Sequence, residues 1–310
     1  MRAIVTGAAG FIGSHLVDAL VARGDDVVGI DNLSTGRRER ANPGAPLVVE
    51  DIRKGDALRA AFSDARPQAV FHLAAQADVR VSVERPDYDA DVNVLGTIQV
   101  LEAAREHGAQ VILSSTGGAI YGECERPARE DDELAPFSPY GTSKLAAEQY
   151  LATTNRLHGT GHVALRYGNV YGPRQDPHGE AGVVAIFFGR FAEDRAATIF
   201  GTGRQTRDYV YVGDVVTATM AAFGRSGGVF NVGTGRETSV LELHDACRRV
   251  SGADLEPEFA AERLGELERS VLDTGLASRE LGFEAAVALD DGLARTWASI
   301  REGEPEAAAN

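Results

Sequence analysis

The sequence has few cysteines, no long apolar run and a shortage of positive charge, and each shortage excludes a class of protein. Its two cysteines, Cys124 and Cys247, are too few for a disulfide framework and lack the spacing of metal ligands. No apolar run is long enough to cross a bilayer, and the chain opens on a β-branched run instead of a charged and then apolar signal pattern. We therefore expect a cytoplasmic protein without a membrane partner or a metal site.

The charge balance excludes a second group of partners. The chain carries 31 Lys and Arg against 46 Asp and Glu, a formal net charge of −15. Nucleic acids and anionic membranes would be repelled by such a surface, so a phosphate-bearing ligand must be held by local groups. The 310 residues, 44% of them hydrophobic, are enough for one large domain or two modest ones.

The first distinctive stretch is a strand-to-helix turn at the start of the chain. Residues 1–6 form a β-branched run, and helical spacing of apolar residues begins at Phe11. Gly7, Gly10 and Gly13 lie where the β-branched run gives way to the helix. A tight turn there brings a pyrophosphate to the free N–H groups of the helix N-terminus. The spacing is GxxGxxG and not GxGxxG, so the glycines alone could also serve only to form a turn, without binding a nucleotide.

An acidic residue follows the second β-branched run and favours one cofactor. Asp31 ends the run 26–30 and stands 18 residues after Gly13. A carboxylate there accepts hydrogen bonds from ribose hydroxyls and repels a 2′-phosphate, which favours NAD over NADP. Asp31 could instead only cap the turn at 32–36, and Arg37 and Arg38 lie close enough to leave NADP open.

Alternating runs predict a Rossmann-type doubly wound parallel sheet, in an α/β chain with a smaller C-terminal α/β part. Residues 1–167 should bind NAD, with 208–228 returning to them, and residues 168–310 should bind the substrate. Expected strands are 1–6, 26–30, 47–50, 69–73, 110–114 and 161–166. Expected helices are 55–62, 89–107 and 140–158. Polar or small residues follow several strands at the edge where ligands bind: Asp51, Ile52, Ala74, Ala75, Gln76, Ser114, Ser115 and Thr116.

The strongest local signal for chemistry is the pair Tyr140 and Lys144. Four residues apart on a helix, the phenol and the ammonium project from one face. A neighbouring Lys⁺, joined by the positive nicotinamide ring, would lower the tyrosine pKa and make a usable general base. Alternatively, Tyr140 is only a half-buried aromatic at the start of an amphipathic helix.

Together with these features, four further motifs resemble the nucleotide-sugar branch of the extended short-chain dehydrogenase/reductase superfamily. The similarity runs from residue 1 to about residue 283. The motifs are His72-Leu-Ala-Ala-Gln76, Leu113-Ser-Ser-Thr-Gly-Gly-Ala-Ile-Tyr-Gly122, Leu165-Arg-Tyr-Gly-Asn-Val-Tyr-Gly-Pro-Arg174 and Arg207-Asp-Tyr-Val-Tyr-Val-Gly-Asp214.

The resemblance implies a role for each matching residue. Tyr140 would be the acid/base, Lys144 would hold the nicotinamide ribose, and Thr116 would relay the proton of the sugar 4-OH. The implied NAD contacts, besides Tyr140 and Lys144, are Gly7, Gly10, Phe11, Ile12, Gly13, Asp31, Asn32, Asp51, Ile52, Leu73, Ala74, Ala75, Gln76 and Ser114. The implied substrate contacts, besides Thr116, are Asn169, Val183, Arg207, Arg263 and Glu266.

The implied activity is NAD-dependent 4-epimerisation of a UDP-hexose, UDP-glucose to UDP-galactose, in a homodimer that pairs segment 87–107 and the helix at Tyr140. UDP-glucuronate/UDP-galacturonate is the alternative, since Gly117 and Gly118 could leave room beside the sugar. Arg80, Arg174 and His178 would then be candidate partners of the uronate. A dehydratase is disfavoured because these glycines replace the acidic pair that it needs. A non-catalytic NAD-binding protein is disfavoured because Tyr140 and Lys144 are both present.

Overall fold

The computed structural model describes residues 1–177, 182–262 and 267–302. Three residues of the predicted site, His178, Arg263 and Glu266, therefore lie outside the described residues.

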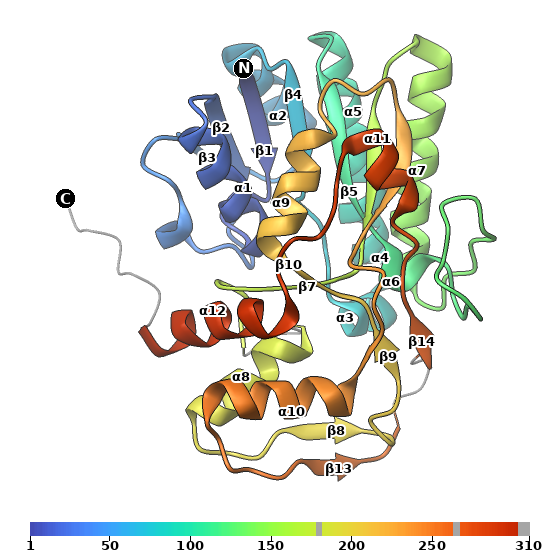
Figure 1. The fold of residues 1–310 in the computed structure, drawn as a ribbon. Helices are drawn as coiled ribbons and strands as arrows, with labels where there is room; N and C mark the ends of the chain where they lie inside the picture. Colours follow the sequence, from blue (N-terminus) through green and yellow to red (C-terminus); the bar gives the residue numbers. More distant parts are fainter. Residues whose placement is uncertain (178–181, 263–266, 303–310) are drawn as a thin grey trace.

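A seven-stranded parallel sheet forms the larger part of the molecule (Figure 1). The strand order is β11-β6-β5-β4-β1-β2-β3, which confirms the doubly wound Rossmann-type fold. The strands are β1 Arg2–Thr6, β2 Asp26–Asp31, β3 Leu47–Val49, β4 Ala69–His72, β5 Gln110–Thr116, β6 Val163–Tyr167 and β11 Gly228–Val232. The sequence did not predict β11, which joins the sheet beside β6 from the second half of the chain.

Helices cover both faces of this sheet because its strands bury side chains on alternate sides. One apolar core joins the strands to α1 (Phe11–Ala22), α9 (Val212–Ala221) and α11 (Gly275–Leu281). A second core joins them to α2 (Gly55–Ala65), α5 (Gly96–Glu106) and α7 (Pro139–His158).

The predicted helix 89–107 is instead three consecutive pieces. They are α4 (Pro86–Ala90), a π-helical segment at Asp91–Leu95, and α5. A π-turn inserts one residue and shifts the apolar register by one position, so a single continuous helical pattern does not hold through Asp91–Leu95. Two short helices flank this region, α3 (Val79–Glu84) and α6 (Gly117–Ile120).

The smaller part lies below the edge of the sheet in Figure 1 and has its own apolar core. Its helices are α8 (Val183–Ala192), α10 (Val240–Ser251) and α12 (Leu289–Glu302). Its short strands are β7 Asn169–Tyr171, β8 Thr198–Phe200, β9 Thr206–Arg207, β10 Tyr209–Tyr211, β12 Thr238–Ser239, β13 Glu258–Ala260 and β14 Arg269–Ser270.

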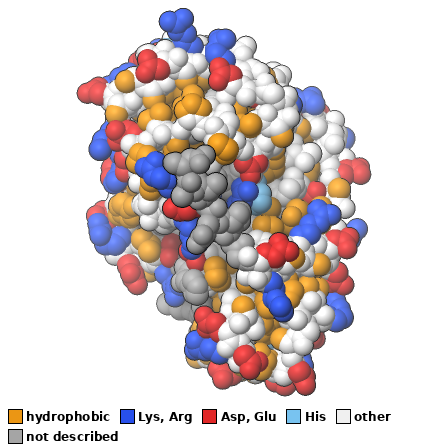
Figure 2. Space-filling view, turned by 90° about the vertical axis from the view of Figure 1, so that its left-hand side faces the viewer, with side chains coloured by type: hydrophobic (Ala, Val, Ile, Leu, Met, Phe, Trp, Pro, Cys, Tyr) orange, Lys and Arg blue, Asp and Glu red, His pale blue; other side chains and the backbone are white. Residues whose placement is uncertain are grey.

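Acidic and basic side chains are interspersed over the face shown in Figure 2. Within residues 1–177, 182–262 and 267–302, no helix is long and apolar enough to span a membrane. The same residues contain no cluster of His, Cys, Asp and Glu that could hold a metal ion.

A buried ion pair fixes α7 against the sheet. Glu148 on α7 and Arg166 on β6 are each no more than 3% exposed, and Arg166 Nη2 donates to Glu148 Oε2 at 2.7 Å. Arg166 also donates to the Tyr121 hydroxyl at 2.7 Å. Because Tyr140 and Lys144 are on the same helix, this pair also fixes the position of the residues predicted to carry the chemistry.

We expect Glu148→Gln to lower the free energy of unfolding by about 3–5 kcal/mol, because it leaves the Arg166 charge buried without a counter-charge. Glu102→Gln is the matched control: its partner is Arg105, both side chains are at least 39% exposed, and the expected cost is about 0–1 kcal/mol. Urea denaturation measures both variants. Equal costs would show that the buried pair does not hold α7 in place.

Candidate active site

The glycine turn has the geometry of a diphosphate site at the N-terminus of α1. Gly7 has φ of +72°, and a Cβ there would lie 2.7 Å from Ala74 N on the neighbouring strand end. A Cβ on Gly13 would lie 2.0 Å from Gly7 O, so only glycine lets α1 begin this close to β1. The first turn of α1 contains no acidic residue, and its N–H groups lack acceptors within the helix. These features fit a dinucleotide pyrophosphate.

Asp31 closes this turn from β2. Its carboxylate accepts hydrogen bonds from Ala9 N at 2.9 Å and from Leu33 N at 2.8 Å, so it does cap the following turn. A carboxylate has about four acceptor positions, which leaves two for ribose hydroxyls. Arg37, one of the two arginines that left NADP as an alternative cofactor, forms an ion pair with Asp176 at 3.1 Å.

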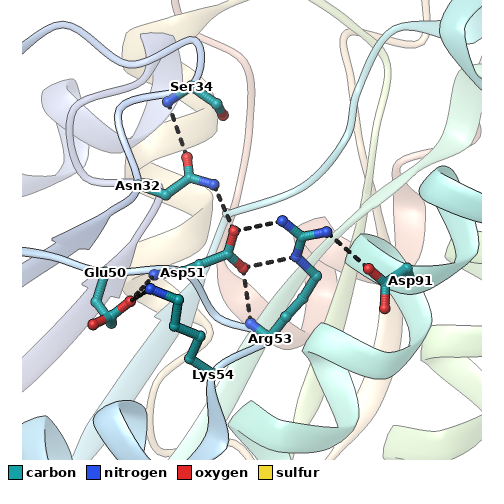
Figure 3. A network of polar contacts seen from close by, with 7 residues as sticks. All are labelled: Asn32, Ser34, Glu50, Asp51, Arg53, Lys54 and Asp91. Atoms are coloured by element: carbon teal, nitrogen blue, oxygen red, sulfur yellow. Dashed lines mark hydrogen bonds and ion pairs between the residues drawn. The ribbon is translucent and has the colours of Figure 1, made fainter.

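A polar network beyond β3 involves two predicted cofactor residues (Figure 3). Asp51 accepts from Asn32 Nδ2 at 3.0 Å and from Arg53 Nη2 at 2.7 Å, and Arg53 donates in turn to Asp91 at 2.8 Å. Hydrogen bonds from Arg53 hold the pKa of Asp51 far below its usual range. Both Asp51 oxygens therefore face protein donors, and its prediction as an adenine neighbour stays a prediction.

Tyr140, Lys144 and Thr116 come together where α7 meets the end of β5. The Thr116 hydroxyl lies close enough to the Tyr140 phenol to lower its pKa, and Lys144 Nζ donates to the Ser114 carbonyl at 2.8 Å. Ser138 caps α7 by accepting from Gly141 N, and Pro139 at the first helical position sets where the helix begins. Lys144 is 5% exposed and Thr116 is 9% exposed.

The protein's own groups raise the pKa of Tyr140, whereas the sequence predicted that it would be lowered. Burial raises the pKa of Tyr140 to about 12, while the hydrogen bond from Thr116 opposes that rise and the charge of Asp89 adds to it. Burial also lowers the pKa of Lys144 to about 8. For Tyr140, desolvation by burial therefore exceeds any lowering of the pKa by Lys144 one turn away.

Gly118 marks the predicted substrate side. A Cβ built on Gly118 would lie 3.4 Å from Asn169 Oδ1, 3.9 Å from Thr116 Oγ1 and 4.0 Å from Ser270 Oγ. Thr116 and Asn169, both predicted, therefore lie near one point, and Ser270 on β14 pairs with Arg207 on β9. The sequence analysis missed Ser270, which follows Thr116 by about half the chain and belongs to none of the motifs.

The two glycines after Thr116 differ in what surrounds them. A Cβ on Gly117 would lie 2.6 Å from two carbons of the Leu272 side chain, so this position is packed and leaves no room for a ligand. Only Gly118 has ordinary van der Waals space. The expectation that both glycines open the sugar site is therefore wrong for Gly117.

Of the candidate uronate partners, Arg80 and Arg174 lie within the described residues and belong to different segments of the chain. Arg174 forms an ion pair with Asp18 of α1 at 2.7 Å, and the preceding Pro173 carbonyl accepts a hydrogen bond from His15 Nε2 at 2.9 Å. Arg80 is exposed on α3. Val183 begins α8 and is partly buried.

A buried polar network behind the site was not foreseen from the sequence. Asn93, in the π-helical segment, accepts from Gln76 N and donates to Gln76 O, both at 2.9 Å, and contacts Ser143 Oγ of α7 at 3.0 Å. Asp89 accepts from Gln76 Nε2 at 2.8 Å. The network fixes the loop 74–76, which is predicted to contact the cofactor, to the helix that carries Tyr140. A break in helical periodicity near Asn93 would have been its one sequence signal.

Comparison with known proteins places the chain among sugar-nucleotide enzymes. The NAD dependent epimerase/dehydratase family matches residues 3–233. UDP-glucose 4-epimerase of Mycolicibacterium smegmatis is 48% identical over 305 residues, covering 96% of this chain and 97% of that protein. The crystal structure of UDP-glucose 4-epimerase with UDP-glucose from Thermotoga maritima is 45% identical, covers 97% of this chain and 99% of its own, and has a TM-score of 0.95. That of the Thermus thermophilus enzyme complexed with NAD is 45% identical with the same coverage and a TM-score of 0.92.

Proposed function

Because the chain belongs to the NAD-dependent epimerase/dehydratase family, we propose that it is a UDP-glucose 4-epimerase, an isomerase that inverts C4 of a UDP-hexose. One observation carries the proposal for this chain. Tyr140, with Thr116 close enough to lower its pKa, and the buried Lys144 stand at the carboxyl end of β5, in the sheet whose strand β1 ends in the glycine turn. A tyrosine and a lysine there suit proton transfer at a sugar hydroxyl.

NAD, when bound, supplies the acceptor and donor of the C4 hydride and a positive ring charge beside Tyr140. The glycine turn and α1 would hold its pyrophosphate, Asp31 its adenosine ribose, and Lys144 its nicotinamide ribose. The proposed division of the chain assigns residues 1–167, with 208–228, to NAD and residues 168–310 to the nucleotide sugar.

Tyr140 would take the proton of the sugar 4-OH, and Thr116 would hold that hydroxyl and relay the proton. The Thr116 hydroxyl already lies close enough to the Tyr140 phenol to act on its pKa, so one sugar 4-OH can reach both groups. The Lys144 ammonium and the ring charge would oppose the burial that raises the Tyr140 pKa. The phenolate is then accessible at the pH of the reaction.

Inversion requires that the diphosphate stay bound while the 4-keto sugar turns over. Asn169 on β7 and Arg207 on β9 are the described candidates for holding the diphosphate. The side chains around Gly118 are Thr116, Asn169 and Ser270, and none of them carries a charge that would pin the sugar in one orientation. A dehydratase would need an acidic side chain after Thr116 to eliminate water. Gly117 provides none, and Leu272 fills the space beside it.

Anomeric-proton NMR of the protein incubated with one UDP-sugar at a time tests the function. We expect UDP-glucose to convert to UDP-galactose without added NAD, and UDP-glucuronate to remain unchanged, because the charge of Arg174 is already balanced by Asp18. Inversion of the uronate alone would overturn the hexose assignment. Inversion of neither would overturn the proposed function.

A homodimer formed through the α5 and α7 face is also proposed. Leu95 and Leu157, on the two helical segments concerned, are 54% and 72% exposed. Val100 and Leu101, which the sequence offered for this interface, are instead at most 2% exposed in the core under α5. Light scattering that gives twice the mass of one chain would support the dimer.

A further inference from the structure

Asp89 on α4 is a buried carboxylate to which the proposed reaction assigns no role. It is 1% exposed, and its Oδ1 accepts from Gln76 Nε2 at 2.8 Å and from Asn93 Nδ2 at 3.2 Å. Within the described part of the chain, its Oδ2 has no hydrogen-bond partner and its carboxylate forms no ion pair. A buried, half-satisfied carboxylate is costly, so its presence needs a reason.

The position of Asp89 points to α7. Helix α4 packs directly against α7 (Figure 1). The Asn93 amide contacts both Asp89 Oδ1 and Ser143 Oγ, and Ser143 precedes Lys144 in the chain. Asp89 therefore lies one side chain away from the helical turn that carries Lys144.

Lys144 has few other charges around it. Glu148, one turn further along α7, is paired with Arg166 of β6. Burial lowers the pKa of His72 on β4 to about 3, so that ring is neutral. Asp78 caps α3, Asp91 of the π-helical segment pairs with Arg53, and Arg80 and Glu84 of α3 are exposed. Asp89 is thus a buried anion near Lys144 whose charge no described cation other than Lys144 balances.

We propose that the Asp89 carboxylate is the buried counter-charge of the Lys144 ammonium and thereby sets the pH range in which Tyr140 and Lys144 work. The part of this proposal that concerns turnover rests on the proposed function. Asp89 is a positioning residue here, because it acts on Lys144 and Tyr140 without touching the substrate.

The sign of the effect follows from the charge. The negative charge of Asp89 raises the pKa of Lys144 against the lowering by burial, and it adds to the burial that raises the pKa of Tyr140. Asp89→Asn keeps an oxygen for the Gln76 and Asn93 donors and removes only the charge. Both pKa values should therefore fall in the variant.

The chain offers a direct measurement because it contains only two lysines, Lys54 and Lys144. In protein loaded with NAD and labelled with ¹³C at lysine Cε, two signals titrate, and Lys54→Arg assigns them. Lys54 is 69% exposed and serves as the internal reference. We expect Asp89→Asn to lower the Lys144 midpoint by about 0.5–1 pH unit. Asp87→Asn, on the same helix with a 75% exposed side chain, should leave it in place.

An unchanged Lys144 midpoint in Asp89→Asn would overturn the proposal. If that variant does not fold, Asp89→Ser removes the same charge and is read in the same way. In turnover, both limbs of the kcat–pH profile should move to lower pH in Asp89→Asn, whereas a purely structural role would lower kcat without moving them. Because the NMR titration needs no substrate, its result stands even if the proposed function fails.

Discussion

Tyr140→Phe is expected to lower kcat for UDP-glucose by about 10²–10⁴ while the protein keeps its NAD. The change removes one oxygen, which is the atom whose pKa Thr116 lowers and the proposed acceptor of the 4-OH proton. The glycine turn, Asp31 and Lys144 are unchanged, so the cofactor contacts should persist. Steady-state rates and the NAD content of the purified variant measure the two effects separately.

Tyr150→Phe is the matched control for this prediction. Tyr150 is on the same helix and is 48% exposed, so removal of its hydroxyl should leave kcat within about twofold of the wild-type value. Near-normal turnover by Tyr140→Phe would mean that another group moves the proton.

Gly13→Ala is expected to give protein that purifies without NAD and unfolds more readily, by about 1–3 kcal/mol. The added Cβ would be 2.0 Å from Gly7 O and 2.8 Å from Gly7 C, both backbone atoms of the phosphate turn. Neither can rotate aside, so α1 must move away from β1 and carry its N-terminal N–H groups with it. The NAD released by denaturing the protein, and its melting temperature, measure the effect.

Gly10→Ala provides a graded comparison. Its Cβ would be 3.2 Å from Gly7 O and meets nothing else within 4 Å, so the fold should survive while the pyrophosphate loses space. We therefore expect reduced NAD content with a near-normal melting temperature. A full NAD complement in both variants would show that the glycine turn is not part of the cofactor site.

The features that could be predicted from the sequence are those with a local cause. β-Branched runs between helical stretches place six strands of the sheet within two residues of their observed ends. The strand β11 was missed because its run is short, follows a glycine-rich loop and pairs with a strand more than sixty residues away. The Tyr140 and Lys144 pair was found because both residues share one helix.

The features that could not be predicted depend on contacts between distant segments. Asp89, Gln76 and Asn93 form their network only once a loop, α4 and the π-helical segment meet. The sequence offered Arg174 as a partner for a uronate, but in the fold it forms an ion pair with Asp18 of the first helix. The raised pKa of Tyr140 has the same origin, since burial is a property of the assembled fold and spacing along a helix does not report it.

The most direct test of the account follows a label at sugar C4. UDP-[4-²H]glucose is incubated in ordinary water with purified protein and no added cofactor, and the product is examined by NMR and mass spectrometry. The account predicts UDP-galactose that keeps the deuterium at C4, because the hydride that leaves C4 stays bound to carbon on the cofactor, does not exchange with water and returns to the same sugar. Loss of the deuterium to solvent, or an unchanged configuration at C4, would contradict it.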